Sequence, residues 1–492
     1  MDDTNSLIEQ RRAKLLDLKQ KGIDPFKNKF IPDFDISIGR ERFEEGKSVK
    51  LAGRIVAHRD MGKSQFFDIR DGTGRIQVYA QKQALGEEQF EVFKRLDMGD
   101  FVGVQGHYFK TRTGEISIKL ESFTILAKAL RPMPEKWKGV VDTEIRYRQR
   151  YLDLMSNPSI QEVFLKRSQI IHEIREFLNE RGFIEVETPM MQGIPGGAAA
   201  APFITHHNSF NCDFYLRISL ELYLKRLLVG GFNRVFEIGR NFRNEGLDRR
   251  HSPEFTMMEL YEAFGDYESM MILLKDMVQR IAMKVLGTLV IETRDEEGNV
   301  TKTIDLREWK RVRYKDLIRE RVGEDWFDIS PAERRERAVR EGAEIGDDYE
   351  DFEVTNAVYE KLIEPTLLNP TFVTHLPKEL VPLAKLSPED PSVVEVFECA
   401  INGQEIAPAY TEQNDPIEQR QRLMEQAGGE KQKLDEDFLI ALEHGMPPAG
   451  GMGIGIDRLV MMFLGQEAIR DVILFPQLKP KNTEGAKEEE TV

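Results

Sequence analysis

The sequence has 492 residues, of which 40% are hydrophobic and 31% are charged, and its net charge is −16. This balance excludes disordered and fibrous proteins, and the length predicts two to four domains. No apolar run approaches the roughly 20 residues that span a bilayer, the N-terminal segment lacks an export signal, and two cysteines cannot form a disulfide framework, so we expect a cytoplasmic protein with no membrane partner.

The first 48 residues predict a helical extension. Residues 5–21 place Leu7, Ile8, Leu15 and Leu18 roughly on one stripe, as in an amphipathic helix. The same segment carries a cluster of basic residues, namely Arg11, Arg12, Lys14, Lys19 and Lys21. These residues form either a local positive surface for RNA, which a negative net charge does not exclude, or a solvated helix face.

Residues 49–130 predict a small β-barrel. Short alternating segments such as LAGRIVAHR and GEISIKLESFTIL are accompanied by turn signals at Asp71-Gly72 and Thr113-Gly114. Several short strands within about eighty residues are typical of an OB-fold, which is a small barrel that binds oligonucleotides. The barrel is the first of two predicted domains.

The rest of the chain divides into three parts. The proline-containing segment 131–158 is expected to link the barrel to a second domain. Residues 159–481 predict a long α+β domain, and a charged stretch at about 310–364 predicts a helical insertion within it. The apolar-poor tail at 482–492 is expected to be disordered.

The first notable segment of the second domain is 167–191. Ile170 and Ile174 contribute to one apolar face of a predicted helix, and Gly182 suits the position just after the helix end. A short strand then ends at Pro189. By itself this unit predicts core packing only.

The second segment, 234–264, predicts two strands around a loop. A period of two residues assigns these side chains to one face of each strand: Glu237, Asn241, Arg243 and Glu245 in the first, and Phe255, Glu259 and Tyr261 in the second. Such a face is a poor core but suits a nucleotide, because a guanidinium binds phosphate and an aromatic ring stacks on a base. Arg249, Arg250 and His251 in the loop suit a polyphosphate. A salt-bridged exposed hairpin is the alternative.

The third segment, 397–416, predicts a hairpin with a type I′ turn at Asn402-Gly403. With that turn, Glu405 lies opposite Ala400, so Glu398 and Glu405 are diagonal neighbours on one face. Diagonal side chains are about 7–8 Å apart at their bases, which leaves room for a cation. We therefore predict that Glu398 and Glu405 bind Mg²⁺. Surface carboxylates without a metal are the alternative.

The fourth segment, 450–463, reads GGMGIGIDRLVMMF. Strand alternation places Gly451, Gly453 and Gly455 on one face and apolar side chains on the other. The glycines form a shelf without side chains on which a flat base can lie. A helix begins next to Arg458, which is then able to reach a terminal phosphate. The surrounding sequence lacks the βαβ unit of a dinucleotide fingerprint.

Taken in this order, the four segments resemble the three signature motifs and the metal-binding strand of class II aminoacyl-tRNA synthetases. The resemblance runs from about Lys50 to Pro480 and is closest to lysyl-tRNA synthetases of the bacterial type, through EVETPMM, PGGA, ELYLKRLLVGGF, RNFRNEG, PEFTMMELY, GIGIDRL and RDVILFP. One such motif is weak evidence, whereas the ordered set is very specific. The family implies an α+β protein with an OB-fold barrel, an antiparallel catalytic sheet flanked by helices, and a homodimer formed through the first segment.

The resemblance implies an enzyme that activates L-lysine with ATP and transfers it to tRNA(Lys). The implied ATP-binding residues are Arg243, Glu245, Arg250, His251, Phe255, Gly453, Gly455 and Arg458. Among them, Arg243 and Arg458 are the catalytic residues; Arg243 would hold the α-phosphate and the substrate carboxylate. That carboxylate is already an anionic nucleophile, so positioning and charge neutralisation carry the rate.

The resemblance also implies two further binding sets. The lysine-binding set comprises Gly197, Glu221, Glu259, Tyr261 and Glu412, in which Glu221 and the backbone near Gly197 meet the α-ammonium and Glu412 and Tyr261 meet the ε-ammonium. The anticodon-binding set comprises Arg59, Phe66, Gln77 and Glu115. In it, Phe66 stacks on a base while the polar side chains read base edges.

The chain departs from the family at two positions. Pro408 stands where the family commonly has Asn, which removes an amide near the substrate ammonium. Because Glu405 and Glu412 have opposite parity, both can face the site only if the strand between them is irregular, and Pro408 is the predicted place of that irregularity. Ala201 stands where relatives often carry Arg or Lys.

Three alternative functions are weighed against lysine activation. An aspartyl- or asparaginyl-tRNA synthetase would need positive groups where Glu412 and Tyr261 stand. A paralogue that lysylates a protein would resemble only the catalytic domain. A non-catalytic RNA-binding protein would not need to retain the residues of the reaction. This chain retains Arg243, Glu398, Glu405 and Arg458, which argues against that alternative.

Overall fold

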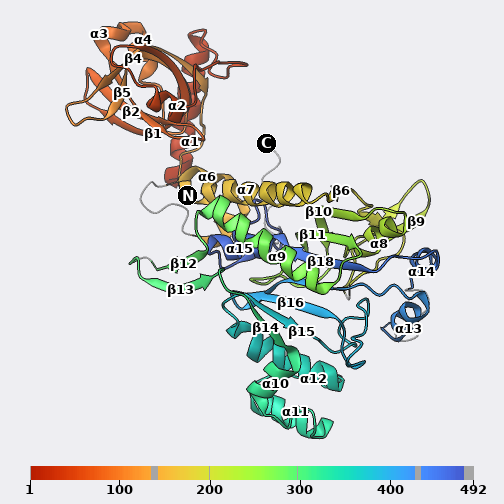
Figure 1. Ribbon diagram of the computed structural model, residues 1–492. Helices are drawn as coiled ribbons and strands as arrows, with labels where there is room; N and C mark the ends of the chain where they lie inside the picture. The colour runs from red at the N-terminus through yellow and green to blue at the C-terminus, as the bar shows by residue number, and fades with distance from the viewer. Residues whose placement is uncertain (1, 135–141, 199, 296, 427–433, 481–492) are drawn as a thin grey trace. The chain divides into compact units, whose positions relative to one another are not determined.

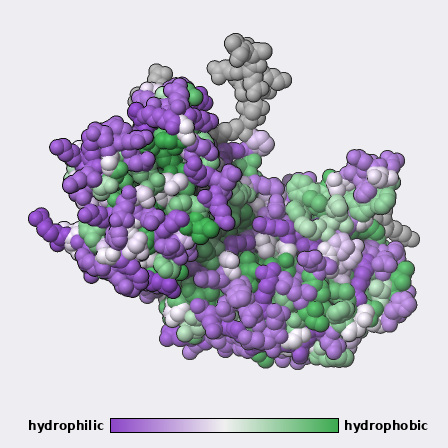
Figure 2. Space-filling model, turned by 90° about the horizontal axis from the view of Figure 1, so that it is seen from above, coloured by the Kyte–Doolittle hydropathy of each residue, from purple (hydrophilic) through white to green (hydrophobic). Residues whose placement is uncertain are grey.

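The computed structural model describes residues 2–134, 142–198, 200–295, 297–426 and 434–480 (Figure 1). The chain forms two compact units, the first made of residues 1–146 with 151–156 and the second of residues 147–150 with 157–492. Hydrophilic residues cover much of the surface seen in Figure 2, with smaller apolar patches between them. None of the described helices is long and apolar enough to cross a membrane.

In the described part of the first unit, five strands close into a barrel in the order β1-β2-β3-β5-β4. The strands are β1 (Ser48–Asp60), β2 (Ser64–Arg70), β3 (Arg75–Gln81), β4 (Phe101–Lys110) and β5 (Ile116–Ala127). Alternation decides which side chains are inside: in β3, Ile76 and Val78 are buried, whereas Gln77 and Tyr79 are partly exposed. The predicted OB-fold barrel is confirmed.

Four helices accompany the barrel: α1 (Asp2–Gln20), α2 (Ile36–Glu41), α3 (Lys82–Leu85) and α4 (Glu87–Phe93). Part of the basic cluster of α1 is used inside this unit. The Arg11 guanidinium donates hydrogen bonds to the carbonyl oxygens of Met98, Ala129 and Arg131, and Lys14 pairs with Asp97 at 2.6 Å. Arg11 and Lys14 therefore attach the helix to the barrel and do not form a free positive surface.

The second unit is built on an eight-stranded sheet, counted over the described residues, with the order β14-β15-β16-β17-β18-β11-β10-β6. Its strands are β6 (Ile184–Glu185), β10 (Arg234–Phe242), β11 (Glu254–Ala263), β14 (Lys310–Arg313), β15 (Thr371–Thr374), β16 (Val396–Ile401), β17 (Gln404–Thr411) and β18 (Ala449–Gly455). The pairs are antiparallel except for β14–β15 and β10–β6 at the two edges. The predicted antiparallel catalytic sheet is confirmed.

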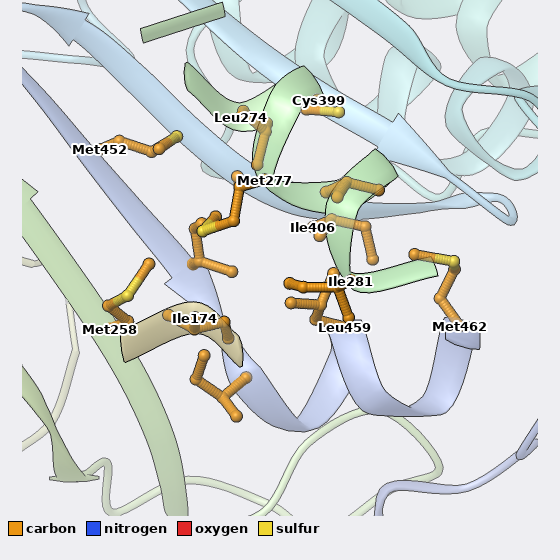
Figure 3. Packing of buried hydrophobic residues seen from close by; sticks show 14 of the residues in the cluster. Ile174, Met258, Leu274, Met277, Ile281, Cys399, Ile406, Met452, Leu459 and Met462 are labelled. Atoms are coloured by element: carbon orange, nitrogen blue, oxygen red, sulfur yellow. The ribbon is translucent and has the colours of Figure 1, made fainter. Parts of the chain in front are cut away.

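Long helices cover one face of this sheet, as Figure 1 shows for α7 (Pro158–Glu180), α9 (Tyr267–Ile281) and α15 (Ile456–Leu464). Figure 3 shows the core between them, where Met277 of α9 and Leu459 of α15 pack with Met258, Met452 and Ile406 of the strands. The same strands direct their other side chains to the opposite face. The helices therefore fix which face is free to carry polar groups.

The other helices of the second unit are α8 (Glu221–Val229), α10 (Tyr314–Val322), α11 (Pro331–Arg340), α12 (Asp351–Val358), α13 (Pro416–Gln426) and α14 (Glu436–Glu443). Its short strands are β7 (Met191–Gln192), β8 (Ile204–His207), β9 (Cys212–Leu216), β12 (Val290–Arg294) and β13 (Val300–Asp305). Helix α5 (Thr143–Arg148) belongs to the first unit up to Arg146. Helices α10 to α12 occupy the segment in which the helical insertion was expected and bury Trp326. The expected linker contains α5 and α6 (Arg150–Ser156). The tail at 482–492 lies outside the described residues.

Candidate active site

The hairpin of β10 and β11 carries the predicted nucleotide-binding face. Its register pairs Glu237 with Glu259 and Asn241 with Phe255, so these side chains share one face as their parity predicts. The prediction was wrong in one respect, because β10 ends at Phe242 and both Arg243 and Glu245 lie in the following loop. The Glu245 N–H donates to the Arg243 carbonyl at 2.8 Å, which turns the chain there.

Arg243 is nevertheless directed into this face. Its guanidinium lies 5.2 Å from the ring centroid of Phe255, and its Nε is buried without a hydrogen-bond partner among the described residues. Burial lowers the pKa of Arg243, while the nearby carboxylates of Glu245, Glu259 and Glu405 oppose that shift. A buried guanidinium with an unused donor is a binding group for an anion.

Arg458, at the start of α15, lies beside the loop that follows β10. Its Nη2 is 3.0 Å from Nε2 of His251, and its Nη1 donates to the carbonyl oxygen of Glu405 at 3.2 Å. On its other side, His251 Nδ1 is 2.7 Å from Asp248 Oδ2. Arg250 is exposed in the same loop. The structure thus brings together three of the residues expected to bind terminal phosphates.

The β16–β17 hairpin has the predicted turn and register. Asn402 and Gly403 both have positive φ, 62° and 71°, as a type I′ turn requires. Glu405 lies opposite Ala400 and Glu398 lies opposite Pro408, so Glu398 and Glu405 share one face. The position of the irregularity was predicted wrongly: the register shifts at Ile406, between the pairs Cys399–Ala407 and Ala400–Glu405. Pro408 is regularly paired.

The carboxylates on this hairpin are under mutual repulsion. Burial, together with Glu405, Glu364 and Glu360, raises the pKa of Glu398 well above its usual range. Burial and Glu405 raise the pKa of Glu364 to about 7, although its carboxylate accepts a 2.5 Å hydrogen bond from the Glu405 N–H. Converging carboxylates of this kind suit a divalent cation. Among the described residues, no group of three or more acidic, histidine or cysteine side chains is arranged for a metal.

The glycine-rich strand β18 lies against β11 as its alternation predicts. Gly451 pairs with Tyr261, Gly453 with Glu259 and Gly455 with Met257. The intervening apolar residues, Met452, Ile454 and Ile456, are buried in the core. An added Cβ at Gly451 would lie 2.0 Å from Glu412 Oε1 and 2.5 Å from a ring carbon of Tyr261. The absence of a side chain at Gly451 therefore makes room for the neighbouring acidic group.

An acidic cluster lies beside Gly451, and we define it as Glu221, Glu259, Tyr261, Tyr410 and Glu412. Tyr261 donates to Glu259 Oε2 at 3.0 Å, and Tyr410 donates to Glu221 Oε1 at 2.7 Å. Burial and nearby Glu221 raise the pKa of Glu259 to about 7, and burial also raises the pKa of Glu412. Gly197 adjoins the cluster, because an added Cβ there would lie 3.3 Å from the Glu221 Cβ.

Three residues of the predicted anticodon-binding set, Arg59, Phe66 and Gln77, share one face of the barrel. Arg59 pairs with Phe66 across β1 and β2, and Phe66 pairs with Tyr79 across β2 and β3. The Phe66 and Tyr79 rings stack with centroids 4.6 Å apart. Gln77 lies two residues before Tyr79 and accepts a hydrogen bond from Ser117 at 3.0 Å. Glu115 precedes β5, and its carboxylate pairs with Arg40 at 3.2 Å, so it is already engaged.

Comparison with known proteins agrees with both units. Residues 142–479 match the model of the family "tRNA synthetases class II (D, K and N)". The chain belongs to this family. Residues 49–126 match the model of the "OB-fold nucleic acid binding domain", which is the barrel.

Full-length relatives of this class II synthetase share about half of its sequence. The Lysine--tRNA ligase of Pelotomaculum thermopropionicum is 50% identical over 492 residues, covering 98% of this chain and 96% of that protein. The Lysine--tRNA ligases of Carboxydothermus hydrogenoformans and Bacillus subtilis are 48% and 46% identical, and each match covers 98% of this chain. These relatives confirm the predicted resemblance to lysyl-tRNA synthetases and the predicted class of enzyme.

Two residues of the synthetase site were missed from the sequence. Lys225 forms ion pairs with Glu221 and Glu412, and Tyr410 hydrogen bonds to Glu221. The signal for Lys225 was its spacing of four residues from Glu221 on one helix face, which is ordinarily typical of a surface pair. Tyr410 has the same parity as Glu412 and was available from the strand pattern.

A separate cavity of about 450 Å³ lies between α7, β12 and the end of α15 in the catalytic unit of this synthetase. Its lining includes Val163, Leu286, Ile291 and Phe463. It contains none of the predicted site residues. The chemistry of the candidate site therefore lies on the sheet face and not in this cavity.

Proposed function

We propose that this chain activates L-lysine with ATP to give lysyl-adenylate and pyrophosphate, and then transfers the lysyl group to the 3′ end of tRNA(Lys). The observation that carries the proposal is the acidic cluster beside Arg243 on the face of the sheet. Three buried carboxylates, Glu221, Glu259 and Glu412, suit a substrate with two ammonium groups. The neighbouring guanidinium suits its carboxylate and a phosphate.

In the proposed reaction, the lysine carboxylate attacks the α-phosphorus of ATP and pyrophosphate leaves. Arg243 would hold both the attacking carboxylate and the α-phosphate, reducing the repulsion between two anions. Phe255 would stack on the adenine and Glu245 would accept from its amino group. Arg458 and Arg250 would neutralise the leaving pyrophosphate, and His251 would orient Arg458 toward it. No general base is required, because the nucleophile is already ionised.

Glu398 and Glu405 would hold Mg²⁺, which is the proposed metal of the site. Mg²⁺ is commonly bound through one or two carboxylates and the substrate phosphates, and the Glu398–Glu405 pair offers that number. When bound, the ion supplies positive charge to the phosphate oxygens. The carbonyl of Glu405 accepts a hydrogen bond from Arg458, so the strand that carries a proposed Mg²⁺ ligand also holds a protein cation.

The outer barrel face would bind the anticodon. Its aromatic pair, Phe66 and Tyr79, supports stacking on unpaired bases, and Arg59 supports a phosphate or base-edge contact. A paralogue that modifies a protein would have no use for this face. Charging of tRNA would place the activity in the cytoplasm.

We also propose a homodimer formed through α7 and the strands after it. Leu165, Ile184, Met190 and Met191 are large hydrophobic side chains that lie exposed along these elements of the single chain. Such a row suits a partner surface. Sedimentation should give twice the chain mass, and Ile184→Asp with Met191→Asp should give the mass of one chain. A single-chain mass for the unmodified protein would exclude the dimer.

The test of the proposed activity is ATP–pyrophosphate exchange by the purified chain with each of the standard amino acids. We expect exchange with lysine only. Exchange with aspartate or asparagine instead would assign the chain to another member of its subclass. Exchange with lysine but no charging of tRNA(Lys) would favour the protein-modifying alternative, and no exchange with any amino acid would favour a non-catalytic protein.

A further inference from the structure

Lys225 is a buried ammonium group that the proposed mechanism does not use. It lies in α8, and its side chain has no solvent exposure. Its Nζ is 2.6 Å from Glu221 Oε1 and also forms an ion pair with Oε2 of Glu412. Nζ is also 5.6 Å from the ring centroid of Tyr410. One side chain therefore joins two carboxylates that come from distant parts of the sequence.

The two oxygens of Glu412 have different surroundings because of this contact. Both oxygens are buried and neither accepts a hydrogen bond from the described residues, but Oε2 forms the ion pair with Lys225 and Oε1 does not. Oε1 lies above Gly451, since an added Cβ at Gly451 would be only 2.0 Å from it. A buried, unpartnered carboxylate oxygen is costly unless a donor arrives. Lys225 fixes the direction in which this oxygen faces.

The charges of the acidic cluster also depend on Lys225. Glu221, Glu259 and Glu412 are three buried carboxylates. Burial and the nearby Glu221 raise the pKa values of Glu259 and Glu412, whereas Lys225 lowers that of Glu412. One resident ammonium leaves the ionised cluster with two negative charges. Free lysine carries two ammonium groups, so the substrate balances that charge. A neutral residue at 225 would leave the cluster one positive charge short.

The Lys225 ammonium does not occupy the place of a substrate ammonium, and we do not expect substrate to displace it. Helix α8 is anchored by Leu220, Leu224 and Leu228, which belong to a buried apolar cluster with Phe438 of α14. Removing the ammonium from this site would leave Glu221 and Glu412 without their ion-pair partner. The side chain therefore remains beneath the cluster while the free oxygens face the substrate.

We infer that Lys225 is a positioning residue that determines specificity, pairing with Glu221 and Glu412 and orienting both carboxylates toward the two amines of the substrate. This inference rests on the proposed lysine activation. The groups that face Lys225 are Glu221 of α8, Tyr410 of β17 and Glu412 after β17, and Glu259 and Tyr261 of β11 complete the surroundings.

The test uses the full-length chain and ATP–pyrophosphate exchange, with lysine and ATP titrated separately between pH 6.5 and pH 9. For Lys225→Met, which keeps the length of the side chain and removes its charge, we expect the KM for lysine at pH 7 to rise by at least roughly 30-fold. The KM for ATP should stay within about twofold. Lys284→Met, at an exposed lysine, is the matched control and should behave like the unmodified chain.

The pH dependence separates positioning from a structural role. Lys225 lowers the pKa of Glu412, so its removal in Lys225→Met should raise that pKa further. The KM for lysine should then fall more steeply from pH 7 to pH 9 than in the unmodified chain. A KM for lysine that is unchanged, or that rises without this steeper pH dependence, would overturn the inference. Absence of lysine-dependent exchange in the unmodified chain would instead overturn the proposed function.

A second variant covers the case in which Lys225→Met does not fold. Lys225→Met combined with Glu412→Gln removes one charge of each sign and relieves the repulsion. We expect the double variant to fold and to raise the KM for lysine above that of Glu412→Gln alone by much less than the roughly 30-fold expected for Lys225→Met, since Lys225 acts in part through this carboxylate. Independent, additive increases in the KM for lysine would contradict the inference.

Discussion

The Arg458 guanidinium donates a hydrogen bond from Nη2 to Nε2 of His251 over 3.0 Å. Because a guanidinium cannot accept, Nε2 is the acceptor, and the ring proton lies on Nδ1, 2.7 Å from Asp248 Oδ2. The imidazole therefore links Asp248 to Arg458 and orients the arginine. Asp248 in turn is held by the Arg250 and His251 N–H groups.

Replacing Arg458 should remove charge neutralisation from the leaving pyrophosphate. We expect Arg458→Ala to lower kcat/KM for ATP in exchange by roughly 10²–10³-fold, the usual effect of losing one preorganised donor. Arg458→Lys should recover only part of the activity, because lysine lacks the planar fork that also reaches the Glu405 carbonyl. Arg340→Ala, at an exposed arginine of α11, is the control. Equal activity of Arg458→Ala and the control would contradict the assignment.

Gly451 should be needed for lysine binding and not for ATP binding. An alanine Cβ at this position would lie 2.0 Å from Glu412 Oε1, so Gly451→Ala must displace that carboxylate or Tyr261. We expect the KM for lysine to rise by roughly tenfold or more, the size of one lost charged hydrogen bond, while the KM for ATP changes little. Gly193→Ala, where nothing lies within 4 Å of the added Cβ, is the control. A rise in both KM values would indicate general damage instead.

The β16–β17 hairpin has features that the sequence predicts correctly and one that it does not. The turn at Asn402-Gly403 fixes its own type and the first pairs, so the placement of Glu405 opposite Ala400 followed from spacing alone. Because Glu405 and Glu412 have opposite parity, the strand had to be irregular between them, but the sequence did not show at which residue. Pro408 seemed the natural place, yet β18 pairs with β17 only from Ala409 onward, so the missing N–H interrupts no pair and the bulge lies at Ile406.

Long-range burial explains what could not be predicted at the site. The pairing of Glu221 with Lys225 follows from helical spacing, but its burial depends on Glu412, which lies nearly 190 residues further along the chain. Arg243 lies just outside the strand in which the alternating pattern placed it, because β10 ends at Phe242. Local pattern fixes faces and turns, whereas the ends of strands and the surroundings of charges depend on packing between elements.

Pro408 offers a way to test the missing amide. Its position opposite Glu398 places residue 408 on the same face as Tyr410. An asparagine there would add a hydrogen-bonding side chain worth about 0.5–1.5 kcal/mol, so Pro408→Asn should lower the KM for lysine by roughly two- to tenfold. Pro408→Ala restores the N–H without the amide and is the matched control. If the alanine variant gave the same change, the backbone and not the side chain would be responsible.

Phe66 should contribute to charging and not to activation. Its ring stacks on Tyr79 on the barrel face, and removal of one stacking platform typically costs about 1–3 kcal/mol per base. Phe66→Ala should therefore raise the KM for tRNA(Lys) by roughly 5- to 150-fold while lysine-dependent exchange is unchanged. Phe101→Ala, which removes an exposed ring elsewhere on the barrel, should leave both activities intact. Loss of exchange in Phe66→Ala would argue against a separate anticodon face.

Glu259 should make the ligand-free chain less stable as pH rises. Burial raises its pKa from 4.5 to about 7, so the folded state holds a proton that the unfolded state has already lost between these values. Stability is therefore fully present below about pH 4.5 and is lost as pH rises through about 7. At 1.36 kcal/mol for each pKa unit, the loss is about 3 kcal/mol at most.

Glu259→Gln removes this titration and keeps an acceptor for the Leu220 N–H. We expect the variant to gain stability relative to the unmodified chain as pH rises from 5 to 8, measured by thermal unfolding without ligands. Glu336→Gln, at an exposed position of α11, should follow the unmodified chain throughout. Lysine should reverse the trend, since its ammonium stabilises the ionised carboxylate and its stabilising effect should grow with pH. Parallel unfolding curves for Glu259→Gln and the unmodified chain would show that Glu259 does not titrate in this range.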